Sequence, residues 1–347
     1  MPVLLPTATD AERSASLARA VERLVKGGLV ALPTETVYGL GARADDATAV
    51  ARIFTTKGRP SDHPLIVHVA DAAGASVYAA EIPPLARRLM DAFWPGPLTV
   101  IVPRRPELAA AAAGGQSSIG LRCPSHPIAQ ALLRAAAQAG VSGVAAPSAN
   151  RFGRVSPTCA AHVMDEFNGQ PDAADLLVLD GGDCEVGIES AIVDCSRGHP
   201  VLLRPGSLGR ERIEAVAGEP LRAPDALAPR ASGTLAAHYA PRAKVRLMSS
   251  QALKDALGVL AASLADAPGT LAKPPTVAVY SRLPKPPGWR AQVWRSMPAD
   301  PAAAAHELFG VLRHFDDVGV GLIWVETPPG DSAWDGVRDR LQRAAAA

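Results

Sequence analysis

The residue types best suited to binding a chain of phosphates occur at Lys57-Gly58-Arg59, just past an expected helix. A lysine supplies a mobile point charge, whereas an arginine supplies a planar fork that can donate two hydrogen bonds to one anion. Lysine is rare in this chain, and residues 1–210 contain only Lys26 and Lys57, so a lysine inside a motif stands out. The competing interpretation is that both charges are solvated and are favoured by the dipole at the helix end.

Polar side chains also occur where buried strands are expected to end. Ser148 and Asn150 follow one such strand and lie two residues apart, so both side chains project to the same side. Loops at the ends of a sheet are common ligand sites in α/β folds, although a serine or Asx turn would use the same residues. Similar hydroxyl or arginine side chains stand at Thr36, Arg122, Ser190 and Arg204. Their convergence predicts a pocket for an anionic ligand.

Several well-known catalytic motifs are absent. The sequence contains no G-x-x-x-x-G-K-[ST], H-E-x-x-H or G-x-S-x-G motif. Residues 39–44 match the loose dinucleotide-binding pattern G-x-G-x-x-A. They do not follow directly on an expected strand, and no acidic residue closes a second strand about 20 residues later. We therefore interpret residues 39–44 as a glycine-rich turn.

Short apolar strands alternate with amphipathic helices over the first 210 residues, which predicts an α/β fold built on a mixed sheet. The expected helices cover residues 10–25, 45–57, 84–93, 127–139 and 158–167. The expected strands cover residues 29–32, 64–70, 98–103, 119–122, 144–146, 176–180, 190–195 and 201–204.

The length of 347 residues favours two domains of ordinary size. We expect a first domain at 1–210, a proline-rich linker at 211–242 and a small Rossmann-like α/β domain at 243–347. Connections between compact domains usually have ~4–6 residues, and much longer ones often serve as lids over binding sites. His238 and Tyr239 are the candidate lid residues of this linker.

Charge and cysteine content exclude some classes of protein. The chain has 35 basic and 34 acidic residues, and residues 1–210 hold 19 basic and 20 acidic ones, so the first domain is no basic nucleic-acid module. The four cysteines have spacings that fit neither a zinc site nor a disulfide framework. No apolar run approaches the roughly 18 residues of a membrane span. We expect a cytoplasmic protein with reduced thiols and no membrane partner.

Eight spaced motifs over roughly residues 15–210 together resemble the YrdC-domain family. They are P-T-E-T-V-Y-G-L-G, K-G-R-P, H-P-L-I-V-H-V, W-P-G-P-L-T, G-L-R-C-P, P-S-A-N, G-I-E-S-A-I-V-D and L-R-P-G. The resemblance implies a YrdC-like first domain that makes L-threonylcarbamoyl-AMP and pyrophosphate from L-threonine, bicarbonate and ATP, acting as a nucleotidyltransferase. The linker resembles that of the two-domain type, although Ser-Gly-Thr-Leu-Ala-Ala stands where a Pro-Gly-Met with aromatic and basic residues is often seen.

The resemblance also implies roles for individual residues. Lys57 and Arg59 would face the ATP phosphates and act in catalysis. The remaining ATP contacts would be His63, Ser118, Ser148, Asn150, Thr158, Arg204 and Tyr239. L-Threonine would be enclosed by Thr36, His68, Arg122 and Ser190, with Arg122 binding its carboxylate through two parallel hydrogen bonds.

The implied chemistry needs no covalent nucleophile, because a carbamate of threonine would attack the α-phosphate of ATP directly. Mg²⁺ would be carried largely by the nucleotide, and the protein would supply no dedicated metal site. The product would pass to the enzymes that place threonylcarbamoyladenosine next to the tRNA anticodon. Two alternatives remain: an RNA-binding module with weak tRNA or double-stranded RNA contact, and another carbamoyl-transfer enzyme with the same pocket. The balanced charge argues against the first alternative.

Overall fold

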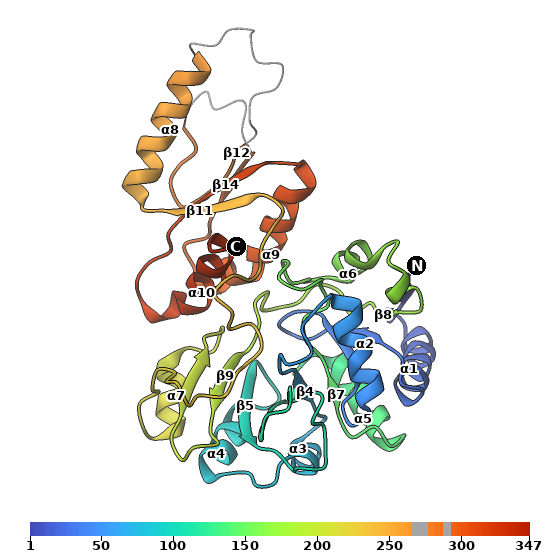
Figure 1. Ribbon diagram of the computed structural model, residues 1–347. Coiled ribbons are helices and arrows are strands. Elements are labelled where there is room, and N and C mark those ends of the chain that lie inside the picture. The colour runs from blue at the N-terminus through green and yellow to red at the C-terminus, as the bar shows by residue number, and fades with distance from the viewer. Residues whose placement is uncertain (266–276, 287–292) are drawn as a thin grey trace. The chain divides into compact units, whose positions relative to one another are not determined.

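The computed structural model describes residues 1–265, 277–286 and 293–347, which divide into two compact units (Figure 1). Unit 1 comprises Met1–Phe152 and Ser156–Thr234, and unit 2 comprises Gly153–Val155 and Leu235–Ala347. The segment expected to form a linker continues in unit 1 as far as Thr234. The three-part division at residues 210 and 242 stays a prediction.

A ten-stranded mixed sheet forms the framework of unit 1, in the order β1-β8-β2-β3-β7-β4-β6-β5-β9-β10. Its strands are β1 Val3–Leu5, β2 Val30–Leu32, β3 Gly39–Arg43, β4 Ile66–His68, β5 Leu98–Pro103, β6 Ser118–Arg122, β7 Val144–Ala145, β8 Leu177–Leu179, β9 Ala191–Asp194 and β10 Val201–Arg204. Strand β4 runs parallel to β6, whereas β5 runs antiparallel to β6 and parallel to β9. The predicted α/β fold with a mixed sheet is confirmed.

Seven α-helices and one short 3-10 helix are described in unit 1. They are α1 Asp10–Val25, α2 Ala47–Lys57, α3 Ala72–Tyr78, α4 Pro84–Phe93, α5 Pro127–Gln138, α6 Ala160–Phe167, α7 Arg210–Ala217 and the 3-10 turn Pro171–Ala173. Helix α2 begins after Asp46, whose side chain accepts from the backbone N–H of Thr48 and Ala49. It ends at Gly58, which has a φ of 62° that favours glycine. This ending places Lys57 on the last turn and directs the chain to Arg59.

The interpretation of residues 39–44 as a turn is wrong, because Gly39–Arg43 forms strand β3 between β2 and β7. Glycine is required there by close packing. A Cβ atom on Gly41 would lie 2.7 Å from Val144 Cγ1 and 2.9 Å from Leu32 Cδ2. The strand escaped prediction because two of its five residues lack the side chains that normally mark strands.

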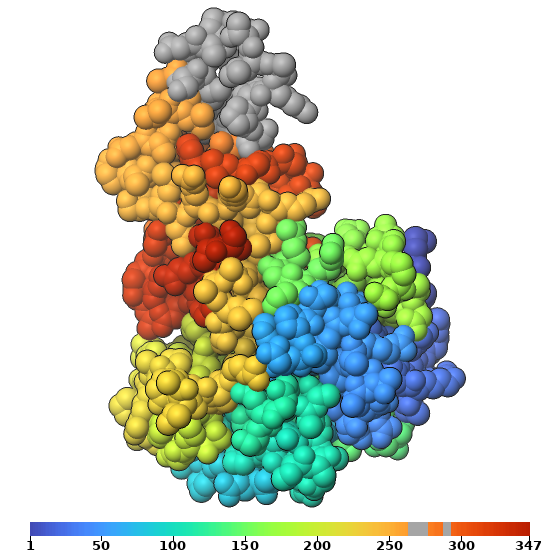
Figure 2. Space-filling model, viewed as in Figure 1, coloured from blue at the N-terminus to red at the C-terminus, as the bar shows by residue number. Residues whose placement is uncertain are grey.

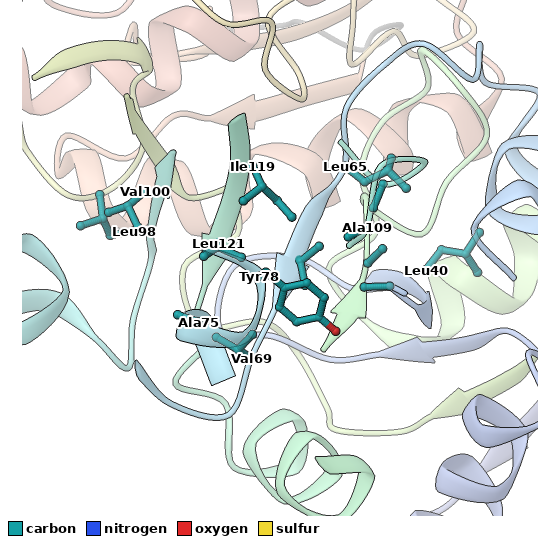
Figure 3. Close-up of a cluster of buried hydrophobic side chains, with 14 of the residues drawn as sticks. Leu40, Leu65, Val69, Ala75, Tyr78, Leu98, Val100, Ala109, Ile119 and Leu121 are labelled. Carbon is teal, nitrogen blue, oxygen red and sulfur yellow. The ribbon is translucent and has the colours of Figure 1, made fainter. Parts of the chain in front are cut away.

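The main core of unit 1 lies against one face of the sheet (Figure 3). Val100 of β5 and Leu121 of β6 are direct cross-strand partners, and both are fully buried. Tyr78 from α3 is buried in the same cluster. Each such large apolar side chain contributes about 1.5–3 kcal/mol by burial, so the strands that carry the polar residues described below rest on a firm support.

Unit 2 contains a four-stranded parallel sheet in the order β11-β14-β12-β13, as expected for a small α/β domain. Its elements are β11 Lys244–Met248, α8 Ser250–Ala265, β12 Val277–Ser281, β13 Val293–Ser296, α9 Pro301–Val318, β14 Leu322–Glu326, the 3-10 turn Ser332–Trp334 and α10 Asp335–Ala345. The buried Glu326 carboxylate accepts from Ser281 Oγ at 2.8 Å and from the backbone N–H of Arg282 at 2.7 Å, which ties the ends of β14 and β12 together. Among the helices described in either unit, none has the length and apolar character needed to cross a membrane.

Candidate active site

Four polar side chains form a buried row across neighbouring strands of unit 1. His68 on β4 is paired in register with Arg122 on β6, and Arg122 is paired with Thr99 on β5. Directly opposed residues of paired strands share one face of the sheet. The Oγ1 atom of Thr99 lies 2.8 Å from Oγ of Ser190, which precedes β9. The row therefore brings together three residues predicted for threonine binding, and it adds Thr99.

Arg122 is held by a buried carboxylate that the role assignments did not include. Its Nη2 atom lies 2.7 Å from Glu35 Oε1, and the two side chains are only 4% and 5% exposed. The other oxygen of Glu35 accepts from the backbone N–H of Ser125 at 3.0 Å. The Nε atom of Arg122 is buried and has no hydrogen-bond partner among the described residues. The Nε–H group of Arg122 is thus a buried donor that is not used by Glu35.

His68 stays neutral in this setting. Burial, together with the adjacent Arg122 cation, lowers the pKa of His68 to about 3. Its Nδ1 atom is also buried without a partner in the part of the chain that the structure describes. A neutral imidazole beside an arginine can offer a substrate either a donor or an acceptor.

Thr36 lies in a turn between β2 and β3 that two threonine hydroxyls stabilise. The Oγ1 atoms of Thr34 and Thr36 are 2.8 Å apart, and Thr34 Oγ1 donates to the carbonyl of Val37 at 2.6 Å. Both side chains are buried. Because Glu35 lies between them, the same turn fixes the threonine-site residue Thr36 and the carboxylate that holds Arg122.

Lys57 points its ammonium group toward the loop that follows β7. Its Nζ atom donates to the carbonyl of Ser148 at 2.5 Å and also to the carbonyl of Asn150. The side chain is 3% exposed, and burial together with the nearby Arg59 cation lowers its pKa well below the usual lysine value. The structure therefore brings Lys57, Ser148 and Asn150 together, as the predicted nucleotide site requires.

Arg59 and His63 both lie close to the Phe152 ring. The Arg59 guanidinium is 5.8 Å from the ring centroid, and the His63 ring centroid is 5.5 Å from it. Arg59 Nη2 also donates to the carbonyl of Pro64 at 3.0 Å, just before β4. Pro64 precedes His68 by four residues, which corresponds to about 13 Å along an extended strand. The two predicted subsites thus lie toward opposite ends of β4.

The other predicted ATP contacts in unit 1 lie on several different elements. Arg204 Nη2 donates to the Ser190 carbonyl at 2.9 Å, and its Nη1 donates to the Ser232 carbonyl at 2.9 Å. Ser118 and Thr99 line a small cavity that residues 230–232 also border. Thr158 lies at the start of α6, where its backbone N–H donates to His162 Nδ1 at 3.2 Å. Arg204 is therefore joined to the predicted threonine site through Ser190.

The predicted lid residues belong to unit 2. The ring of Tyr239 stacks on that of Phe309 at a centroid distance of 5.4 Å, and the Arg340 guanidinium lies 5.4 Å from the Tyr239 centroid. His238 packs edge-on against Tyr239 at 4.1 Å, and both side chains are buried. Tyr239 has a φ of 60°, a backbone conformation uncommon for a bulky residue.

Two family models together match nearly the whole chain. Residues 22–206 match a family described as "Telomere recombination", and residues 208–346 match the "Threonylcarbamoyl-AMP synthase, C-terminal domain". A threonylcarbamoyl-AMP synthase of Bacillus subtilis is 37% identical over 338 residues, covering 95% of this chain and 92% of that protein. The chain belongs to the threonylcarbamoyl-AMP synthase family. The predicted family and the predicted class of enzyme, a transferase, are thereby confirmed.

Other relatives in this family agree. A threonylcarbamoyl-AMP synthase of Pyrococcus abyssi is 44% identical over 226 residues, which span 63% of this chain and 64% of that protein. A crystal structure of P. abyssi Sua5 complexed with L-threonine matches with a TM-score of 0.83 and 34% identity, covering 99% of this chain and 97% of that one.

Three buried residues to which the resemblance gave no role share one feature. Glu35, Thr99 and Glu189 each lie inside a quoted motif, yet none was given a role. Glu189 is buried and accepts a hydrogen bond from Ser156 Oγ. A carboxylate inside an otherwise apolar or hydroxyl-rich motif is the signal that could have indicated Glu35 and Glu189.

Proposed function

We propose that unit 1 makes L-threonylcarbamoyl-AMP and pyrophosphate from L-threonine, bicarbonate and ATP with the residues assigned below. The buried row of His68, Arg122, Thr99 and Ser190 carries this proposal, because its arginine suits a carboxylate and its other members are neutral hydrogen-bonding groups. Lys57 and Arg59, toward the other end of β4, supply the positive charge that a triphosphate needs.

In the proposed reaction, the amine of threonine adds to the carbon of bicarbonate with loss of water and forms a carbamate. A carbamate oxygen then attacks the α-phosphorus in line, a P–O bond forms, and the bond to pyrophosphate breaks. Arg122 and Thr36 hold the amino acid, and Ser190 orients it. Lys57 and Arg59 stabilise the charge that develops on the phosphate oxygens. Positioning the carbamate next to the phosphate accounts for the rest of the acceleration.

The ATP-binding role extends to His63, Ser118, Ser148, Asn150, Thr158 and Arg204 by the same proposal. Ser148 and Asn150 accept hydrogen bonds from Lys57 through their backbone carbonyls, so the loop that carries them lies beside the ammonium group proposed to contact the phosphates. Burial of Asn150 and Arg204 means that each side chain is ordered before a ligand binds. Such preorganisation lowers the entropic cost of binding.

The same proposal has Mg²⁺ enter this site as a partner of the nucleotide. The described residues contain no group of three His, Cys, Asp or Glu side chains that could hold a metal ion. When bound with ATP, the ion would neutralise phosphate charge and favour departure of pyrophosphate. The protein's own contribution remains the cations of Lys57 and Arg59.

The lid role of His238 and Tyr239, and the ATP contact of Tyr239, form a separate part of the proposal. Exclusion of water would protect a carbamate and its mixed anhydride from hydrolysis. The φ of 60° at Tyr239 is uncommon for a bulky residue, and backbone positions of this kind are often found in ligand clamps and switch segments.

We also propose that the product is delivered to the enzymes that modify tRNA. Weak contact of this chain with RNA and a cytoplasmic location are two further proposals. The nearly equal numbers of acidic and basic residues favour a small-molecule product over a tightly held tRNA. A salt-dependent mobility shift of tRNA by the full chain would favour the RNA-binding alternative instead.

Pyrophosphate release from ATP tests the proposed reaction. We expect release that requires both L-threonine and bicarbonate. Equal release when either is omitted would reject the proposal. Turnover with carbamoyl phosphate in place of bicarbonate would favour the alternative carbamoyl-transfer enzyme.

A further inference from the structure

Glu35 is a buried carboxylate whose two oxygens are both occupied. Oε1 accepts from Arg122 at 2.7 Å, and Oε2 accepts from the backbone N–H of Ser125 at 3.0 Å. A carboxylate engaged on both oxygens is poorly placed to act as a general base or to bind a metal ion. The function of Glu35 must therefore lie in its contact with Arg122.

We propose that Glu35 is a positioning residue that orients the Arg122 guanidinium so that its remaining donors bind the carboxylate of the amino-acid substrate. This inference rests on the proposed role of Arg122 in threonine binding. An arginine side chain has several rotatable bonds, and an ion pair at one nitrogen fixes the plane in which the others donate. The buried, unpartnered Nε atom is one such donor.

The backbone on both sides of Glu35 is fixed, so the carboxylate can serve as a rigid support. The hydroxyl of Thr34 accepts from the backbone N–H of Thr36 at 3.2 Å and so closes the turn around Glu35. The carbonyl of Glu35 accepts from the backbone N–H of Val186 at 2.7 Å. The carboxylate thus reaches Arg122 from a turn that is closed locally by Thr34 and anchored to the distant residue Val186.

Glu35 also balances the charge of the row before substrate binds. Its negative charge cancels that of Arg122, and His68 is neutral because its pKa is lowered to about 3. A zwitterionic amino acid has no net charge, so its entry leaves the buried site balanced. Removing one partner of a buried ion pair leaves an uncompensated charge, which is costly. Loss of Glu35 should therefore affect both the orientation and the energy of Arg122.

The test compares Glu35→Gln and Glu35→Asp in the full chain. Glu35→Gln keeps the shape but removes the charge, and we expect the KM for threonine to rise ~10-fold or more, as for other supporting residues, with the KM for ATP unchanged. Glu35→Asp keeps the charge on a shorter side chain and should recover part of the threonine affinity. If Glu35 had a purely structural role, Glu35→Gln would change the KM values for threonine and ATP together, or kcat alone. Glu35→Asp would then not recover threonine affinity.

A double-mutant cycle with Arg122→Lys separates this inference from the proposed function. We expect Glu35→Gln to have little further effect on threonine binding once Arg122 is replaced, because coupled residues give non-additive effects. Additive effects, or an unchanged threonine KM in Glu35→Gln when Arg122→Lys raises it, would overturn the positioning role. An unchanged threonine KM in Arg122→Lys would instead reject the proposed threonine site. Calorimetric titration with threonine gives the same comparison if a variant lacks turnover.

Discussion

The Nζ atom of Lys57 lies 2.5 Å from the carbonyl oxygen of Ser148, so the cation proposed for phosphate binding is held by the backbone of the loop proposed to surround the nucleotide. An ammonium group has three donors, and the two described bonds leave one for a phosphate oxygen. Lys57 would therefore couple the geometry of the 148–150 loop to that of the bound nucleotide.

Replacing Lys57 with alanine should lower kcat/KM by at least ~100-fold, since removal of one preorganised charge-stabilising contact often has that effect. Lys26→Ala is the matched control, because Lys26 is the other lysine of residues 1–210 and its side chain is 70% exposed. Steady-state pyrophosphate release measures both. Near-normal turnover of Lys57→Ala would remove Lys57 from the site. Arg59→Ala should cause a loss of similar size for the same reason.

Arg122→Lys should raise the KM for threonine much more than the KM for ATP, because a lysine cannot donate the two parallel hydrogen bonds of a guanidinium. Arg52→Lys is a suitable control, since Arg52 pairs with Asp175 on the surface and is 42% exposed. Initial rates at varied concentrations of each substrate separate the two constants. Equal increases in both would place Arg122 outside the amino-acid site.

Local sequence patterns indicate candidate residues for the site, but they do not indicate which side chains those residues contact. The end of α2 at Lys57 was predictable because it depends on Gly58, the next residue in the sequence. The contact between Thr99 and Ser190 joins residues 91 positions apart, and it depends on the register of β5 and β9. Strand order and register arise from packing of the whole sheet, which one sequence does not reveal. The same reason explains why the partnership of Glu35 and Arg122 was not predicted.

Acid should destabilise the protein partly through His68. Its pKa in the folded state is about 3, below the ordinary value of 6.5, so below pH 6.5 the unfolded chain takes up a proton that the folded chain does not. The free energy of unfolding should fall toward pH 3 by up to ~1.4 kcal/mol per pH unit from this group. His68→Asn should flatten this slope in urea unfolding measured from pH 7 to pH 4. Parallel curves for the variant and the parent would show that His68 titrates normally.

ATP with threonine should protect the segment of residues 225–242 from trypsin. Residues 225–234 of this segment belong to unit 1 and follow α7 in yellow in Figure 2. Leu227 is 81% exposed there, and Arg230 forms an ion pair with Asp62 at 2.9 Å. A lid that closes over bound nucleotide would slow cleavage after Arg230, which mass spectrometry of the fragments can follow. Cleavage sites elsewhere serve as the internal control. Unchanged cleavage after Arg230 would mean that this segment does not respond to substrate.

The proposed carbamate intermediate can be tested by following the carbon of bicarbonate. With ¹³C-labelled bicarbonate, ATP and L-threonine, we expect a nucleotide product whose mass equals that of threonylcarbamoyl-AMP with one labelled carbon. Arg122→Lys should form less of this product at low threonine, whereas the Arg52→Lys control should match the parent. A threonine adduct of AMP that lacks the label would rule out the carbamate, because it would mean that the carboxylate of the amino acid attacks the α-phosphorus.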